Sequence, residues 1–182
     1  ALSMAYGVTS TTFLLTLGVP PAVASASVHT AEIFTSGTSG ICHIHCGNVD
    51  WKLSSSLMIP GIIGGVTGAY ILTTIASEII KPFIAFYLAI MGLMILRRAY
   101  KRIKHKGVQT HLVPLGLVGG FFDAIGGGGW GPIVTSTLVA RGQDPRHAIG
   151  SVNLTEFFVT VAESATFLLT IGLASTELIL GL

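Results

Sequence analysis

The stretch "FFDAIGGGGWGPIV", residues 121–134, decides the fold of this chain. It places four consecutive glycines inside an apolar segment, with Asp123 before them and Pro132 after them. Glycine and proline are the residues that least favour a helix interior. An unbroken helix over residues 112–140 would be about 40 Å long, which exceeds the ~30 Å hydrocarbon core of a bilayer. The stretch therefore predicts a helix that breaks at the glycines near the middle of a membrane.

The composition supports a membrane setting. The chain has 182 residues, of which 51% are hydrophobic and only 10% charged, and its mean hydropathy is +0.76. Residues 53–77 carry no charged side chain, and residues 112–140 carry only Asp123. Apolar runs of this length indicate membrane-spanning helices. We expect one all-α, polytopic domain over residues 1–182.

Six of the ten lysines and arginines lie between Arg97 and Lys106. Such a cluster marks a cytoplasmic loop, here residues 97–111, and contacts lipid headgroups. This placement does not indicate nucleic-acid binding.

The chain contains an internal repeat. Residues 6–34 align without a gap on residues 130–158, a shift of 124 positions that pairs Gly7 with Gly131 and Glu32 with Glu156. Two related halves around a central site are typical of transporters. We expect repeat one at 1–104 and repeat two at 112–182, with the start of the first and the end of the second missing. Arg141 and Arg146 favour an inverted over a parallel arrangement of the repeats.

The pattern predicts the following helices: 7–17, 21–46, 52–76, 80–104, 112–125, 132–140, 145–172 and a last segment at 176–182.

The break would present a helix N-terminus with free amides to the membrane centre, which suits an anion. The segment "LSMAYG", residues 2–7, takes the same place in repeat one. The alternative is that the glycines only allow tight packing, as we expect for Gly61, Gly64, Gly65 and Gly68. Hydroxyls after each break could bind the anion or bond to their own helix. Asp123 would cap the break or satisfy its amides. The predicted substrate-binding residues are Ser3, Tyr6, Gly7, Thr9, Ser10, Gly126, Gly127, Gly128, Gly129, Trp130, Gly131, Thr135, Ser136 and Asn153.

Glu32 and Glu156 lie about eleven residues into their helices, inside hydrocarbon, where an ionisable group indicates function. His29 shares a helical face with Glu32, and Glu163 shares one with Glu156. We interpret Glu32, Glu156 and His29 as proton-coupling residues. The alternative is that neutral glutamates form hydrogen bonds across helices.

The sequence contains no other chemical motif of weight. "CHIHC", residues 42–46, has metal-ligand chemistry but lacks a second cluster, so no metal or other cofactor is predicted. There is no catalytic triad spacing and no phosphate-binding loop, so we do not expect an enzyme.

The segments "MAYGVTSTTFLLTLGVPPAVASASVHTAEIF", "GNVDWKL", "GGFFDAIGGGGWGPIVTSTLVARG" and "GSVNLTEFF" resemble the sulfite exporter TauE/SafE family, also called the toluenesulfonate uptake permease family. The resemblance covers essentially the whole chain. It implies a two-repeat carrier in the inner membrane of a prokaryote that transports sulfite, sulfoacetate or other organosulfonates. The family pattern also has an Asp–Gly pair upstream of the first repeat and a further helix after residue 182.

We therefore expect a multi-pass secondary transporter for a small sulfur-containing anion, coupled to protons. The alternatives are an anion channel, a metal-cation or proton carrier that uses the intramembrane Glu and His residues, and a non-transporting membrane subunit. The anion itself, the direction of transport, the coupling ion and a homodimeric state are left open by the sequence.

Overall fold

The structure is a computed structural model that describes residues 6–100 and 111–180. These residues form helices and contain no strand, which confirms the all-α prediction. The elements are α1 (Tyr6–Thr16), α2 (Pro21–His45), α3 (Trp51–Thr74), α4 (Ser77–Tyr100), α5 (Leu112–Gly126), the π-helical turn η2 (Gly131–Thr135), α6 (Ser136–Ala140) and α7 (Pro145–Leu180). The predicted basic loop and Ser3 lie largely or wholly outside the described residues.

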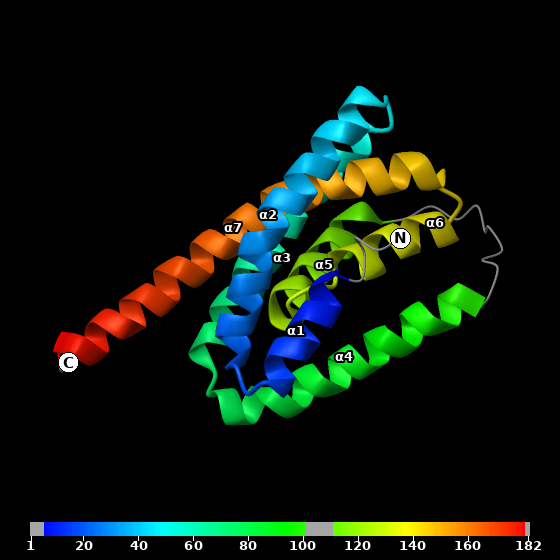
Figure 1. Cartoon of the computed structure of the whole chain (residues 1–182). Coiled ribbons are helices and arrows are strands. Elements are labelled where there is room, and N and C mark those ends of the chain that lie inside the picture. The colour runs from blue at the N-terminus through cyan, green and yellow to red at the C-terminus, as the bar shows by residue number, and fades with distance from the viewer. Residues whose placement is uncertain (1–5, 101–110, 181–182) are drawn as a thin grey trace.

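Helices α2 and α7 pack against each other as an antiparallel pair (Figure 1). Gly37 contacts the ring of Phe157, and Gly40 contacts Leu154. The residue numbers rise along one helix while they fall along the other. These two helices contain the aligned segments of the predicted repeats, and the repeat and its inverted arrangement stay predictions.

Helices α3 and α5 approach each other closely through glycines. A Cβ atom added to Gly68 would lie 2.6 Å from the carbonyl oxygen of Phe121, and one on Gly116 would lie 3.0 Å from that of Leu57. Real Cβ atoms do not tolerate the first of these distances, so only glycine allows this helix spacing. The expectation of tight packing at Gly61, Gly64, Gly65 and Gly68 is confirmed.

The glycine break is present where the sequence predicts it. Helix α5 ends at Gly126, and Gly127 and Gly128 have φ values of 61° and 138°, which suit glycine far better than other residues. The chain then returns along α5 through η2 and α6, so that Gly119 lies beside Trp130 and Val134. Figure 1 shows the resulting helical hairpin. The helix after the break starts as a π turn, which the sequence did not predict.

Helix α7 is longer than expected. The prediction of a separate segment at 176–182 is wrong, because α7 continues without a break to Leu180. One isolated glycine, Gly172, costs a helix only about 1 kcal/mol. At the other end, Asp144 accepts hydrogen bonds from the backbone and ring of His147, and the ring bond lowers the pKa of this exposed carboxyl.

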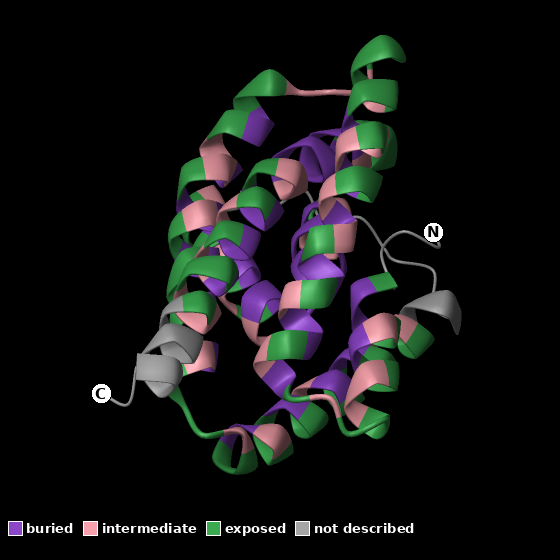
Figure 2. Cartoon of the chain, turned by 60° about the vertical axis from the view of Figure 1, so that its left-hand side comes forward, coloured by how far each residue is buried: buried purple, intermediate pink, exposed green. Residues whose placement is uncertain are grey.

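The outer surface of the bundle is apolar. Three helical segments within the described residues are long and apolar enough to cross a membrane: Trp51–Thr74, Ser77–Arg97 and Pro145–Gly172. Large side chains such as Phe83 and Leu168 are each 70% exposed. Exposed faces line the outside of the long helices, and buried residues gather between them (Figure 2). Such a surface requires an apolar solvent, so the protein is a multi-pass membrane protein.

Candidate functional site

A cluster of buried ionisable side chains lies beside the glycine break. His29 Nε2 is 2.9 Å from Glu163 Oε2, 3.7 Å from Asp123 Oδ2 and 4.0 Å from Glu32 Oε2. The side chains of His29 and Glu163 are 0% exposed. One ligating atom from each of His29, Asp123 and Glu163 lies within 4.8 Å of the others. The cluster is therefore compact enough to share one proton or to enclose one small cation.

The cluster separates two apolar cores. Phe167, one turn after Glu163, belongs to the core that also contains Ala124 and Ile84. Val159, one turn before Glu163, belongs to the core around Trp130. Helix α7 thus carries its buried carboxylate between two dry regions. Ionised groups in such surroundings are costly unless they are compensated.

Asp123 holds the backbone of the break. Its Oδ1 accepts hydrogen bonds from the amides of Gly129 and Trp130, and its carbonyl oxygen accepts from the amides of Gly127 and Gly128. The predicted role of Asp123 in satisfying the break is confirmed. The expectation of free amides is wrong at these four residues, because two of the amides donate to the carboxylate of Asp123 and two to its backbone carbonyl oxygen.

The start of α1 contacts the break directly. A Cβ atom added to Gly7 would lie 2.6 Å from the Cα atom of Gly128 and 2.7 Å from Glu32 Oε1. Thr11, one turn further along α1, donates a hydrogen bond of 2.7 Å to the carbonyl oxygen of Gly127. The structure therefore brings the start of α1, the predicted counterpart of the break in repeat one, into contact with the glycine break itself. Glu32 lies beside this contact.

Three buried hydroxyl groups near this region have no hydrogen-bond partner among the described residues: Tyr87, Thr135 and Ser164. The ring of Tyr87 lies against Gly126 and its hydroxyl against Gly129, while the same ring stacks on Phe122 at 5.3 Å between centroids. Buried hydroxyls usually find a partner. These groups are therefore candidates to donate to a bound ligand.

The predicted substrate-binding residues do not all lie in one site. Gly7, Gly127 and Gly128 meet beside Glu32, and Gly126 and Gly129 lie against Tyr87. Gly131 and Thr135 are buried in η2. Tyr6 and Thr9 are exposed, and Ser10 and Ser136 are partly buried.

Two predicted residues serve helix packing. The indole of Trp130 donates a hydrogen bond of 3.2 Å to the carbonyl oxygen of Val152. Asn153 donates one of 2.7 Å to Ser39 Oγ, which joins α7 to α2. Glu156, one of the predicted proton-coupling residues, lies two turns before Glu163 and is partly buried.

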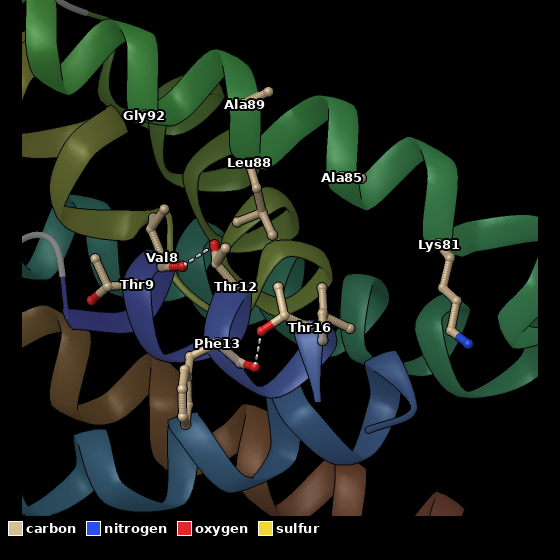
Figure 3. A pocket seen from close by; sticks show the side chains of 11 residues that line it. Val8, Thr9, Thr12, Phe13, Thr16, Lys81, Ala85, Leu88, Ala89 and Gly92 are labelled. Atoms are coloured by element: carbon tan, nitrogen blue, oxygen red, sulfur yellow. Dashed lines mark hydrogen bonds between the residues drawn. The ribbon is translucent and has the colours of Figure 1, made fainter. Parts of the chain in front are cut away.

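A cavity of about 840 Å³ lies between α1 and α4 (Figure 3). None of its lining residues belongs to the ionisable cluster. Its walls are mostly apolar. Thr12 and Thr16 face it, but their hydroxyls donate to the carbonyls of Val8 and Phe13 in their own helix. Its one lysine, Lys81, lies 3.5 Å from Glu78. Thr9 lines this cavity and not the break.

The main residues that sequence reasoning did not assign to the site are Glu163 and Tyr87. Glu163 shares a helical face with Glu156, but its contact with His29 bridges 134 positions of sequence and depends on the crossing of α2 and α7. Tyr87 has no local signal at all. Cys42 and Cys46 are exposed free thiols at the end of α2, and about 20 Å of helix separates Cys42 from His29.

Comparisons with known proteins identify the family of this chain. The family described as sulfite exporter TauE/SafE matches residues 1–182. A curated relative from Bacillus subtilis (strain 168), described as "Probable membrane transporter protein YtnM", is 44% identical over 180 residues. The match covers 94% of this chain and 60% of the relative, so the chain spans about three fifths of that relative's length. No solved structure matches the chain significantly. The chain belongs to the sulfite exporter TauE/SafE family.

Proposed function

We propose that this protein is a secondary transporter that moves small sulfur-containing anions, such as sulfite, sulfoacetate or other organosulfonates, across the cytoplasmic membrane of a prokaryote. The observation that carries the proposal is the contact between Gly7 of α1 and Gly128 of the break, beside the buried carboxylate of Glu32. Backbone that leaves helical geometry within a membrane is tolerated where it lines a ligand pathway or is buried in protein. The family description, sulfite exporter, supports a sulfur oxyanion as the substrate, and the description of the Bacillus relative as a probable membrane transporter supports transport across a bacterial membrane.

The anion would bind at the break, on the side where buried hydroxyls remain without partners. Tyr87 and Thr135 offer O–H donors from two different elements. Several donors that converge on one group favour a polyoxygen anion over chloride, because each oxygen accepts its own hydrogen bonds. The glycines bring the backbone close to the ligand without side-chain obstruction.

Proton coupling follows from the charges around the break. Glu32, Asp123 and Glu163 are all acids, and none of the ion pairs that this cluster forms within residues 6–100 and 111–180 involves lysine or arginine. An anion that approaches ionised carboxylates in a dry interior is repelled strongly. Uptake of protons by the cluster removes this repulsion, so anion and proton bind together. The predicted proton-coupling residues Glu32, Glu156 and His29 belong to this proposal.

The test is transport by the purified protein in proteoliposomes, with and without a pH gradient. We expect saturable sulfite flux that an inward proton gradient accelerates and that chloride does not compete for. Flux that is neither saturable nor dependent on pH would instead indicate an anion channel. Flux that ignores sulfite and follows a divalent metal ion would indicate a cation carrier and would overturn the proposal.

A further inference from the structure

His29 carries a hydrogen on Nδ1. This atom lies 2.8 Å from the carbonyl oxygen of Ser25, which can only accept a hydrogen bond. The hydroxyl of Ser25, 3.2 Å from the same nitrogen, donates its own hydrogen to the carbonyl oxygen of Ala124 at 2.6 Å. It therefore faces the imidazole with a lone pair. The tautomer of His29 is fixed by these contacts.

The contact between His29 and Glu163 requires one additional proton. With its hydrogen on Nδ1, a neutral imidazole presents a lone pair at Nε2, and an ionised carboxylate also presents lone pairs. The Nε2 and Oε2 atoms are nevertheless 2.9 Å apart, and neither atom has a hydrogen-bond partner among the described residues. One proton between them, on either residue, turns a repulsive contact into a charge-assisted or neutral hydrogen bond.

Loss of this proton would leave an uncompensated charge in a dry place. Both side chains are 0% exposed. Within the part of the chain that the structure describes, the ionisable groups around the pair are Glu32 from α2, Asp123 from α5, Glu156 from α7 and, through Asp123, Tyr87 from α4. All of them are acids, so none replaces the missing positive charge. The binding or release of a charged ligand nearby therefore changes the affinity of the pair for this proton.

The same helix pair contains an uncharged counterpart of this contact. Asn153 stands 124 positions after His29, and Glu163 stands 124 positions after Ser39, in the register that aligns the two glycine segments. Asn153 donates a hydrogen bond of 2.7 Å to Ser39. At one end of the α2–α7 contact the pair is therefore Asn with Ser, and at the other end it is His with Glu. The packing of these helices is satisfied by a neutral pair and does not demand ionisable residues.

We infer that His29 and Glu163 together form the binding site of the proton that is transported with the anion. This inference rests on the proposed function and places the coupling proton between His29 Nε2 and Glu163 Oε2. The remaining oxygens of the cluster on Glu32 and Asp123 modulate the site through their charge.

The proton site is connected to the break through Asp123. One oxygen of Asp123 lies 3.7 Å from His29 Nε2, while the other accepts from the amides of Gly129 and Trp130. When the pair loses its proton, the negative charge next to Asp123 increases. The strength of the hydrogen bonds between Asp123 and the two amides then changes as well. The positive-φ residues Gly127 and Gly128 allow the backbone of the break to move in response.

The decisive experiment compares accumulation with exchange in proteoliposomes. One pH unit corresponds to about 1.4 kcal/mol, so coupling to one proton supports about 100-fold accumulation of sulfite at a gradient of two units. We expect wild type and the control E78Q, whose carboxylate is exposed, to show proton-driven accumulation. The double variant H29N/E163S, which copies the Asn–Ser pair, and the single variant E163Q should lose accumulation. Sulfite exchange at equal pH is measured beside accumulation in every sample, since exchange needs no net proton movement.

The outcomes separate the inference from the proposed function. Absence of any sulfite flux in wild type would contradict the proposed function itself. Normal flux in wild type together with proton-driven accumulation in E163Q or H29N/E163S would leave the transporter intact and overturn the assignment of the proton.

A second measurement does not depend on the stability of the variants. Trp130 is buried and its backbone amide binds Asp123, whereas Trp51 is 63% exposed. In the variant W51F, the emission of Trp130 should report a single protonation step in a pH titration, and E163Q in this background should remove the step. A flat profile in W51F overturns the inference. If zinc or manganese at constant pH changed the Trp130 emission as protonation does, the inference would also be overturned, because the pair would then bind a metal ion.

Discussion

The hydroxyl of Thr11 in α1 donates a hydrogen bond to the carbonyl oxygen of Gly127, the residue that follows the end of α5. The two residues are 116 positions apart, and Thr11 is only 1% exposed. This bond satisfies a carbonyl oxygen near the break, where the helical hydrogen bonds of α5 stop. It also joins α1 to the glycine break. Backbone groups freed by a break must be paired in this way when they are buried.

The variant T11V should therefore lower stability. Valine has nearly the same shape but no donor, so the carbonyl of Gly127 would remain unsatisfied, at a cost of about 1–3 kcal/mol. Thermal unfolding in detergent measures the loss. The matched control is T12V, because the hydroxyl of Thr12 only adds to the carbonyl of Val8 in its own helix. Equal Tm values for the two variants would contradict the role of the bond.

The contact between Gly7 and Gly128 predicts opposite effects for two glycine-to-alanine changes. In G7A the new methyl group would meet Gly128 and Glu32, and such overpacking costs about 1–3 kcal/mol. In G92A, on α4, the methyl group meets no atom within 4 Å, and alanine is better than glycine in a helix by about 1 kcal/mol. We expect the Tm to fall in G7A and to stay or rise in G92A. A rise in both would show that α1 is not held against the break.

Asp123 can be tested by changing its charge and its hydrogen-bond capacity separately. D123A leaves the amides of Gly129 and Trp130 without an acceptor, and each buried orphan costs about 1–3 kcal/mol. D123N retains one acceptor oxygen and should lose clearly less. Chemical denaturation compares the two variants. If they were equally stable, the amides would not depend on this side chain.

Tyr87 is predicted to contact the anion. Its hydroxyl is buried beside Gly129 and has no partner in the described part of the chain, so Y87F should not destabilise the fold. A hydrogen bond to a charged group contributes about 1.5–3 kcal/mol, so sulfite affinity should fall about tenfold or more. Binding measured by calorimetry tests this, with Y70F as the control, because Tyr70 is 57% exposed on α3. Unchanged affinity in Y87F would remove Tyr87 from the site.

Sequence reasoning predicted the features that depend on local chemistry. The four glycines predicted the break, since four consecutive weak helix formers are more than tight helix packing requires. The small residues of α3 predicted its close packing, and Asp123 predicted the cap of the break. Each of these signals is contained within a few neighbouring residues.

The partners across helices could not be predicted in the same way. The pairing of His29 with Glu163 depends on where α2 and α7 cross, and the position of Tyr87 depends on how α4 packs on the hairpin. The free amides were predicted wrongly because the carboxylate of Asp123 reaches forward to residues 129 and 130, a competition that only the folded geometry settles. The continuation of α7 was missed because one glycine is too weak a signal to end a long helix.

The π turn at Gly131–Thr135 gives the hairpin a built-in means of rotation. A π turn holds one residue more than an α turn, and one residue corresponds to about 100° and 1.5 Å along a helix. If this π turn changed to α geometry, α6 would rotate about its axis and shift along it. Different side chains of α6 would then face the rest of the bundle, and the helical hydrogen bonds elsewhere would stay intact.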